Sequence, residues 1–200
     1  NSTLDFHGAK NRINAIINSV SKERQCKVYF MHGSFTEQEM LSLYNPKYID
    51  CYITATHGEG FGIPLFNAAC NGIPVIATNW SGHLDFLRAP SVNSAGKTKF
   101  KSHFLKTEYD LGPINQQHIM PGLISEGCIW AYPKEESFRK NLRFVYKNKP
   151  SVIEDTENLQ RHLRNKMSLS TISKKYREFT IENLKDKVWS NKQIGEIVSV

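Results

Sequence analysis

The chain has 200 residues, of which 40% are hydrophobic and 22% charged, and its formal net charge is +7 at pH 7. This length and composition suffice for one well-buried globular domain. No apolar run reaches the roughly 18 residues that indicate a membrane-spanning helix. The first residues also lack the basic region and apolar core of a secretory signal, so we expect a protein of the cytoplasm.

The cysteines indicate the redox compartment of the protein, and the basic residues indicate which kinds of partner it could bind. The chain has four cysteines, Cys26, Cys51, Cys70 and Cys128. They form no Cys-x-x-Cys pair, and Cys51 and Cys70 stand among apolar residues, which favours a reducing compartment. Basic residues gather at positions 97–106 and 161–177; we interpret them mainly as solvated faces, with a peripheral membrane or interdomain contact as the alternative. Without a basic motif interleaved with aromatic residues, nucleic acid is not expected as a partner.

In chain order, the first elements expected are a strand at residues 4–7, a helix at 9–20, a strand at 27–31 and a helix at 37–44. The last of these begins with a capping box formed by Thr36 and Glu39. Lys10 and Arg12 stand at the start of the first helix, where the helix dipole disfavours cations. We therefore expect these two residues to face an anion, the alternative being two solvated surface cations.

The most informative stretch is a glycine loop that follows a short apolar strand expected at residues 51–54. In the loop, Gly58, Gly60 and Gly62 alternate with His57, Glu59 and Phe61. Glycine lets the backbone take positive φ and come close to a ligand. His57 is expected either to contact that ligand or to brace the loop through a hydrogen bond to backbone.

A helix is expected to begin at Ile63, with Pro64 in its first turn, and to end at Gly72. Its N-terminus would point beyond the carboxyl end of the strand, where open α/β sheets bind ligands, and it favours an anion such as a diphosphate. Glu59 does not suit that anion. Its carboxylate would accept hydrogen bonds from hydroxyl groups or stabilise a cationic transition state; sugar diphosphates combine these features.

Further elements follow the loop: a strand after Gly72, a short helix at residues 82–87, a strand at 127–131, and helices at 133–146, 151–168 and 171–184. Residues 89–123 are broken by prolines and glycines and indicate short strands or a packed loop. We expect Phe138, Leu142 and Val145 to face inward. Ile172, Tyr176 and Phe179 could pack on the sheet. His83 and Asp85 are interpreted as polar residues at a helix start.

These elements predict one doubly wound α/β domain with a mostly parallel sheet. Residues 1–150 would form the sheet core and residues 151–200 extra carboxyl-terminal helices. No set of His, Cys and carboxylate residues has metal-ligand spacing, and no serine stands in a nucleophile elbow. Neither a metal nor a cofactor is therefore expected.

Two segments, Glu59-Gly-Phe-Gly-Ile-Pro64 and Cys70-Asn-Gly-Ile-Pro-Val-Ile76, resemble motifs of the retaining GT-B glycosyltransferases of the glycogen synthase and sucrose synthase type. The resemblance implies the Rossmann-like, carboxyl-terminal donor-binding half of such an enzyme, with the acceptor-binding half absent from this chain. The activity implied is metal-independent transfer of a sugar, with retention of configuration, from a UDP-, GDP- or ADP-sugar to a hydroxyl of an acceptor such as a glycan.

The same resemblance implies roles for individual residues. Glu59 would be the catalytic residue that faces the donor sugar. The residues implied to bind the donor sugar and its diphosphate are Lys10, Arg12, His57, Gly58, Gly60, Phe61, Gly62, Ile63, Ser81 and Gly82. Asn67 would bind the ribose, in a position where the family usually has a glutamate. Two alternatives to the transferase remain: a noncatalytic nucleotide-sugar-binding module, and a nucleotide-sugar epimerase of the same architecture.

Overall fold

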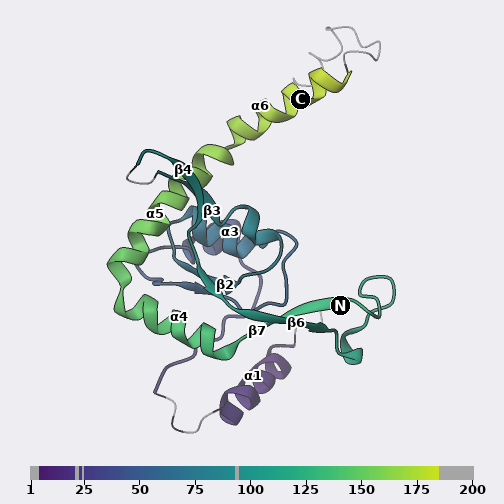
Figure 1. The fold of residues 1–200 in the computed structure, drawn as a ribbon. Helices are drawn as coiled ribbons and strands as arrows, with labels where there is room; N and C mark the ends of the chain where they lie inside the picture. The colour runs from purple at the N-terminus through teal and green to yellow at the C-terminus, as the bar shows by residue number, and fades with distance from the viewer. Residues whose placement is uncertain (1–4, 21–22, 24, 93–94, 185–200) are drawn as a thin grey trace. The chain divides into compact units, whose positions relative to one another are not determined.

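A computed structural model describes residues 5–20, 23, 25–92 and 95–184 of the chain (Figure 1). The chain divides into two compact units, Asn1–Met40 and Leu41–Val200. Each unit is described separately below. That all 200 residues belong to a single domain stays a prediction.

The first unit contains helix α1, Phe6–Val20. Asp5 caps this helix, because its carboxylate accepts hydrogen bonds from the backbone N–H groups of His7 and Gly8 at 3.0 and 2.8 Å. The strand predicted at residues 4–7 is therefore wrong for Phe6 and His7, which are helical; Leu4 lies outside the described residues. The strand predicted at residues 27–31 is also wrong, since this extended backbone pairs with no strand in the described part of the chain.

Helix α2, Glu37–Ser42, confirms the predicted capping box. The backbone N–H of Thr36 donates to Glu39 Oε2 at 2.7 Å, and the backbone N–H of Glu39 donates to Thr36 Oγ1 at 3.3 Å. The bond from the Thr36 backbone, and after it the bond that the Thr36 hydroxyl donates to Glu39 Oε2 at 2.8 Å, lower the pKa of the Glu39 carboxyl. The helix ends two residues before the predicted position at Tyr44.

The second unit is built on a parallel sheet whose strands follow the order β1-β2-β5. These strands are β1, Tyr52–Ile53, β2, Val75–Thr78, and β5, Leu105–Thr107. The chain crosses from β1 to β2 through helix α3, Ile63–Cys70, as parallel neighbours require. The predicted α/β class with a mostly parallel sheet is thus confirmed, and it is consistent with a Rossmann-like GT-B half.

Two antiparallel strand pairs accompany this sheet. They are β3, Arg88–Val92, with β4, Thr98–Ser102, and β6, Tyr109–Pro113, with β7, Ile129–Pro133. Short 3-10 helices occur at η1, Gly82–Asp85, and η2, Gln116–His118. The described residues of 89–123 therefore contain short strands, and β7 lies two residues beyond the strand predicted at 127–131.

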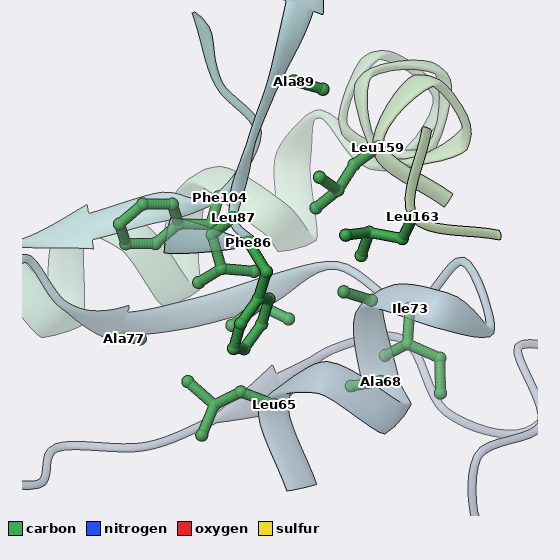
Figure 2. Packing of buried hydrophobic residues seen from close by; sticks show 12 residues of the cluster. Leu65, Ala68, Ile73, Ala77, Phe86, Leu87, Ala89, Phe104, Leu159 and Leu163 are labelled. Atoms are coloured by element: carbon green, nitrogen blue, oxygen red, sulfur yellow. The ribbon is translucent and has the colours of Figure 1, made fainter. Parts of the chain in front are cut away.

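Three helices follow in the described part of the chain: α4, Glu135–Lys147, α5, Lys149–Lys166, and α6, Leu169–Leu184. Helix α5 packs against α3 and β3. In the core, Leu159 and Leu163 of α5 belong to one buried cluster with Leu65 of α3 and Phe86 (Figure 2). This packing holds α3, and with it the loop that precedes α3, in a fixed place beside the sheet.

The predicted inward faces of α4 and α6 are only partly confirmed. Val145 is buried and Phe138 packs beside it, but Leu142 is 37% exposed. Tyr176 and Phe179 of α6 are 70% and 65% exposed, so the prediction that they pack on the sheet is wrong. The physical reason is that α3 and α4 pack against the parallel sheet, whereas α6 contacts α5 and extends beyond its end (Figure 1).

Within the described ranges, no helix combines the length and the apolar character that crossing a bilayer requires.

The packing of α5 gives a direct test of the core. Leu163 is fully buried, whereas Leu169, at the start of α6, is 84% exposed. Leu163→Ala should lower the free energy of unfolding by about 2–5 kcal/mol, because it leaves a cavity between α5 and α3. The control Leu169→Ala should change it by no more than about 0.5 kcal/mol. Urea unfolding measures both, and equal effects of the two variants would contradict this packing.

Candidate functional site

A cavity of about 450 Å³ opens in the second unit at the loop between β1 and α3. Its lining residues are Thr56, His57, Gly58, Glu59, Gly60, Trp80, Ile129 and Trp130. Three segments supply them: the glycine loop, the segment that follows β2, and strand β7. The cavity therefore lies at the carboxyl ends of two neighbouring parallel strands, where α/β folds bind ligands.

Ser81 and Gly82 hold the backbone of Glu59. The N–H of Glu59 donates to Ser81 Oγ at 2.7 Å, and the N–H of Gly82 donates to the Glu59 carbonyl at 3.0 Å. Ser81 adopts φ 81° and ψ −163°, a conformation that normally only glycine takes, so its backbone is strained. Strain of this kind persists only where surrounding contacts enforce it, and here two hydrogen bonds to one residue do so.

The same contact requires glycine at position 82. A Cβ on Gly82 would lie 1.9 Å from the Gly60 carbonyl oxygen and 2.9 Å from that of Glu59. No larger residue fits there without moving the loop. By contrast, a Cβ on Gly60 would meet nothing within 4 Å.

The end of the loop is fixed by a turn and by aromatic packing. Gly62 has φ 84° and precedes α3 directly, with Pro64 in the first turn as predicted. The ring of Phe61 packs against Phe66 and Phe86 at centroid distances of 5.3 and 5.0 Å. Phe61 thus anchors the loop to the core, whereas Ile63 is 64% exposed beside it.

His57 braces the loop against strand β7. Its Nδ1 donates to the carbonyl of Ala131 at 2.8 Å. Its ring stacks on Trp130 at 4.6 Å and an interplanar angle of 13°. One of the two roles considered for His57, a hydrogen bond to backbone, is therefore present, and His57 also lines the cavity.

Glu59 is half-buried and lines the same cavity. Among the described residues, its carboxylate has neither a hydrogen-bond donor nor a cation as a partner. Its charge acts on Tyr52, whose pKa is raised first by burial and then by the charges of Tyr44 and Glu59. An unpaired carboxylate on a rigidly held backbone is suited to accept hydrogen bonds from a ligand.

Three further predicted residues are Asn67, Lys10 and Arg12. Asn67 is half-buried on α3 and does not line the cavity. Lys10 and Arg12 are exposed residues of α1, in the first unit. The premise that they stand at a helix start is wrong, because the Asp5 cap begins α1 at Phe6; Lys10 Nζ instead lies 5.7 Å from the centre of the Phe6 ring. Their ligand roles stay predictions.

His83 and Asp85 lie in the short helix η1, which agrees with their interpretation as polar residues at a helix start. His83, however, is completely buried and its Nε2 donates to the Thr78 carbonyl at 2.7 Å. Its role is therefore to tie η1 to the end of β2, close to Ser81 and Gly82.

Sequence reasoning did not place Ile129 and Trp130 in the site. Both belong to β7, and the loop contacts this strand across 74 positions of sequence through His57 and Ala131. The available signal was the alternation of Trp130 and Tyr132 on one strand, which puts two aromatic side chains on the same face. Trp80 also lines the cavity, and its ring lies 5.5 Å from that of Tyr109.

A larger cavity, of about 520 Å³, lies between the β3–β4 pair and α5. In this cavity Asp155 accepts from Lys101 at 2.7 Å and from His103 at 3.1 Å, and Glu154 is a second acidic residue of the lining. We consider the smaller cavity the better candidate, because it lies at the carboxyl ends of two neighbouring parallel strands. In the described part of the chain, no group of three or more His, Cys, Asp or Glu residues could hold a metal ion.

Substitution of the two glycines tests the contact that shapes the site. Gly82→Ala should lower the free energy of unfolding by about 1–3 kcal/mol, because the added methyl group cannot be accommodated beside Gly60. Gly60→Ala, the matched control, should lower it by less than about 1 kcal/mol, since its Cβ meets open space. Chemical denaturation measures both. Equal stabilities of the two variants would show that segments 59–60 and 81–82 do not touch.

The family described as Glycosyl transferases group 1 matches residues 4–94 of the chain. The match spans less than half of the sequence and includes the glycine loop, α3, β2 and the Ser81–Gly82 segment. It supports a relationship to the group 1 glycosyltransferases in general. Neither a curated protein nor a solved structure matches the chain. Strand β7, which supplies one wall of the cavity, lies outside the matched segment.

Proposed function

From the similarity of residues 4–94 to group 1 glycosyltransferases, we propose that this chain is the donor-binding part of an enzyme that transfers a sugar from a nucleotide diphosphate sugar to an acceptor hydroxyl, with retention of configuration. One observation carries the proposal: the unpaired carboxylate of Glu59, a residue of the matched segment, lines a cavity, and its loop leads directly into the N-terminus of α3. A carboxylate suits sugar hydroxyls, and a helix N-terminus suits phosphate.

In the proposed reaction, the N-terminus of α3 and the carboxylate of Glu59 have different roles. The N-terminus of α3, with roughly half a unit of positive charge, would stabilise the departing diphosphate. Glu59 would orient the sugar and stabilise the oxocarbenium-like charge that develops at its anomeric carbon. The bonds from Ser81 and Gly82 would keep the Glu59 backbone in place during this step. No metal is required in this scheme.

A noncatalytic nucleotide-sugar-binding module is the second candidate. Asn67 favours it, because the family resemblance implies a charged glutamate there and the neutral amide binds a ribose diol more weakly. Calorimetry separates the two functions: the module binds a nucleotide sugar but neither transfers nor hydrolyses it, even when the acceptor-binding partner is present.

Replacing the carboxylate tests the transferase. Glu59→Gln keeps the size and the backbone bonds of the residue but removes its charge. It should lower sugar transfer from the preferred nucleotide sugar by about 100-fold or more, with unfolding unchanged. The control is Glu157→Gln, at an exposed position of α5, which should transfer at the wild-type rate. Transfer is measured as release of nucleotide diphosphate in the presence of acceptor; wild-type turnover by Glu59→Gln would refute the role.

The predicted diphosphate contacts require a separate test. The double variant Lys10→Gln, Arg12→Gln should weaken binding of both the nucleotide sugar and the free nucleotide diphosphate by about tenfold or more, because charged hydrogen bonds to phosphate are lost. Isothermal titration calorimetry measures both affinities. Lys140→Gln, Arg143→Gln on α4, a control that removes two exposed cations, should leave them unchanged. If the two double variants behave alike, Lys10 and Arg12 do not contact the diphosphate.

A further inference from the structure

The hairpin of β6 and β7 forms one wall of the cavity, although it lies outside the segment that matches the family. Ile129 and Trp130 of β7 line the cavity opposite the glycine loop. The ring of Trp130 contacts His57 on the loop at 4.6 Å and His118 of η2 at 5.4 Å. This wall is therefore attached to the loop by stacked rings.

The hairpin also decides which nitrogen of His57 carries the proton. The carbonyl of Ala131, 2.8 Å from Nδ1, can only accept a hydrogen bond. Nδ1 therefore carries the hydrogen, and Nε2 of the neutral ring keeps its lone pair. Nothing in the described ranges pairs with Nε2, and it is not among the buried polar atoms left without a partner there. Nε2 is therefore an accessible acceptor on a residue that lines the cavity.

Two acceptors thus border one cavity: the Nε2 of His57 and the carboxylate of Glu59. Both are held, His57 by Ala131 and Trp130, Glu59 by its backbone bonds to residues 81–82. Neither can donate a hydrogen bond in this state, so a complementary ligand must offer at least two donors. Trp80 and Ile129 add apolar surface of the kind that packs against the C–H groups of a sugar ring.

We propose that the β6–β7 hairpin is the element that recognises the sugar of the donor: it fixes His57 so that Nε2 and the Glu59 carboxylate together accept hydrogen bonds from two free hydroxyl groups of a hexose. This inference rests on the proposed function and specifies its substrate. Donors that lack one of these hydroxyls leave an acceptor in the cavity unpaired, and such sites reject their analogues strongly.

The test compares affinities for a nucleotide hexose and for its nucleotide diphosphate without the sugar. UDP-, GDP- and ADP-glucose and the matching mannose and galactose compounds are screened by calorimetry with the full chain. The wild-type protein should bind the preferred nucleotide hexose at least tenfold more tightly than the nucleotide diphosphate. His57→Phe keeps a ring on Trp130 but removes both nitrogens; it should lower this ratio to about one and leave the affinity for the nucleotide diphosphate unchanged.

His118→Phe is the matched control, because His118 also contacts Trp130 but does not line the cavity. Its affinity ratio should equal that of the wild type. A wild-type ratio in His57→Phe, or an equal loss for both ligands, would overturn the inference while the proposed function stands. Failure of the wild type to bind either compound would overturn the proposed function itself.

A second measurement needs no variant. In nucleotide hexoses with one hydroxyl replaced by fluorine, the substituted position can no longer donate a hydrogen bond. Within the series made from the preferred hexose, at least two members should bind the wild-type protein tenfold more weakly or worse. Equal affinities across the whole series would overturn the recognition by two acceptors, whatever the behaviour of His57→Phe.

Discussion

The site depends on the contact between Glu59-Gly60 and Ser81-Gly82. Residue 82 is a glycine because the Gly60 carbonyl occupies the space where its Cβ would lie. In the same contact, the backbone of Ser81 has a strained conformation with positive φ. The contact joins the loops that follow two parallel neighbours, β1 and β2. It therefore holds two loops together as one rigid edge of the cavity. Because both hydrogen bonds are made by the backbone of Glu59, its carboxylate stays unpaired among the described residues.

Much of the fold could be predicted because its signals are local. The capping box at Thr36 and the glycine and proline at the ends of α3 each act within a few residues, and the structure has them as expected. Short strands are expected somewhere in residues 89–123, but the position of β5 is not, because Leu105–Thr107 is only three residues long and is defined by its pairing with β2. The opposite error occurred at residues 27–31, where β-propensity is present but no partner strand is found in the described ranges.

The candidate site also has one part that local sequence signals predict and one part that only tertiary contacts create. The glycine loop could be found from sequence, because alternating glycines around an acidic residue have few structural uses. The wall formed by Ile129 and Trp130 could not, since only the folded chain brings β7 to His57. Nor does the sequence disclose that Ser81 has positive φ or that Phe61 packs on the core. These properties arise from tertiary contacts, which override the local preferences of serine and of an exposed loop.

A crystal structure with the preferred nucleotide sugar tests the central claim most directly. The account predicts the sugar ring in the cavity between the glycine loop and β7, with a hydroxyl within hydrogen-bond distance, about 2.6–3.2 Å, of the Glu59 carboxylate. It also predicts that two hydrogen bonds persist, one donated by the Glu59 N–H to Ser81 Oγ and one donated by the Gly82 N–H to the Glu59 carbonyl. A sugar bound in the cavity beside Lys101 and Asp155, or one whose hydroxyls avoid Glu59, would contradict it.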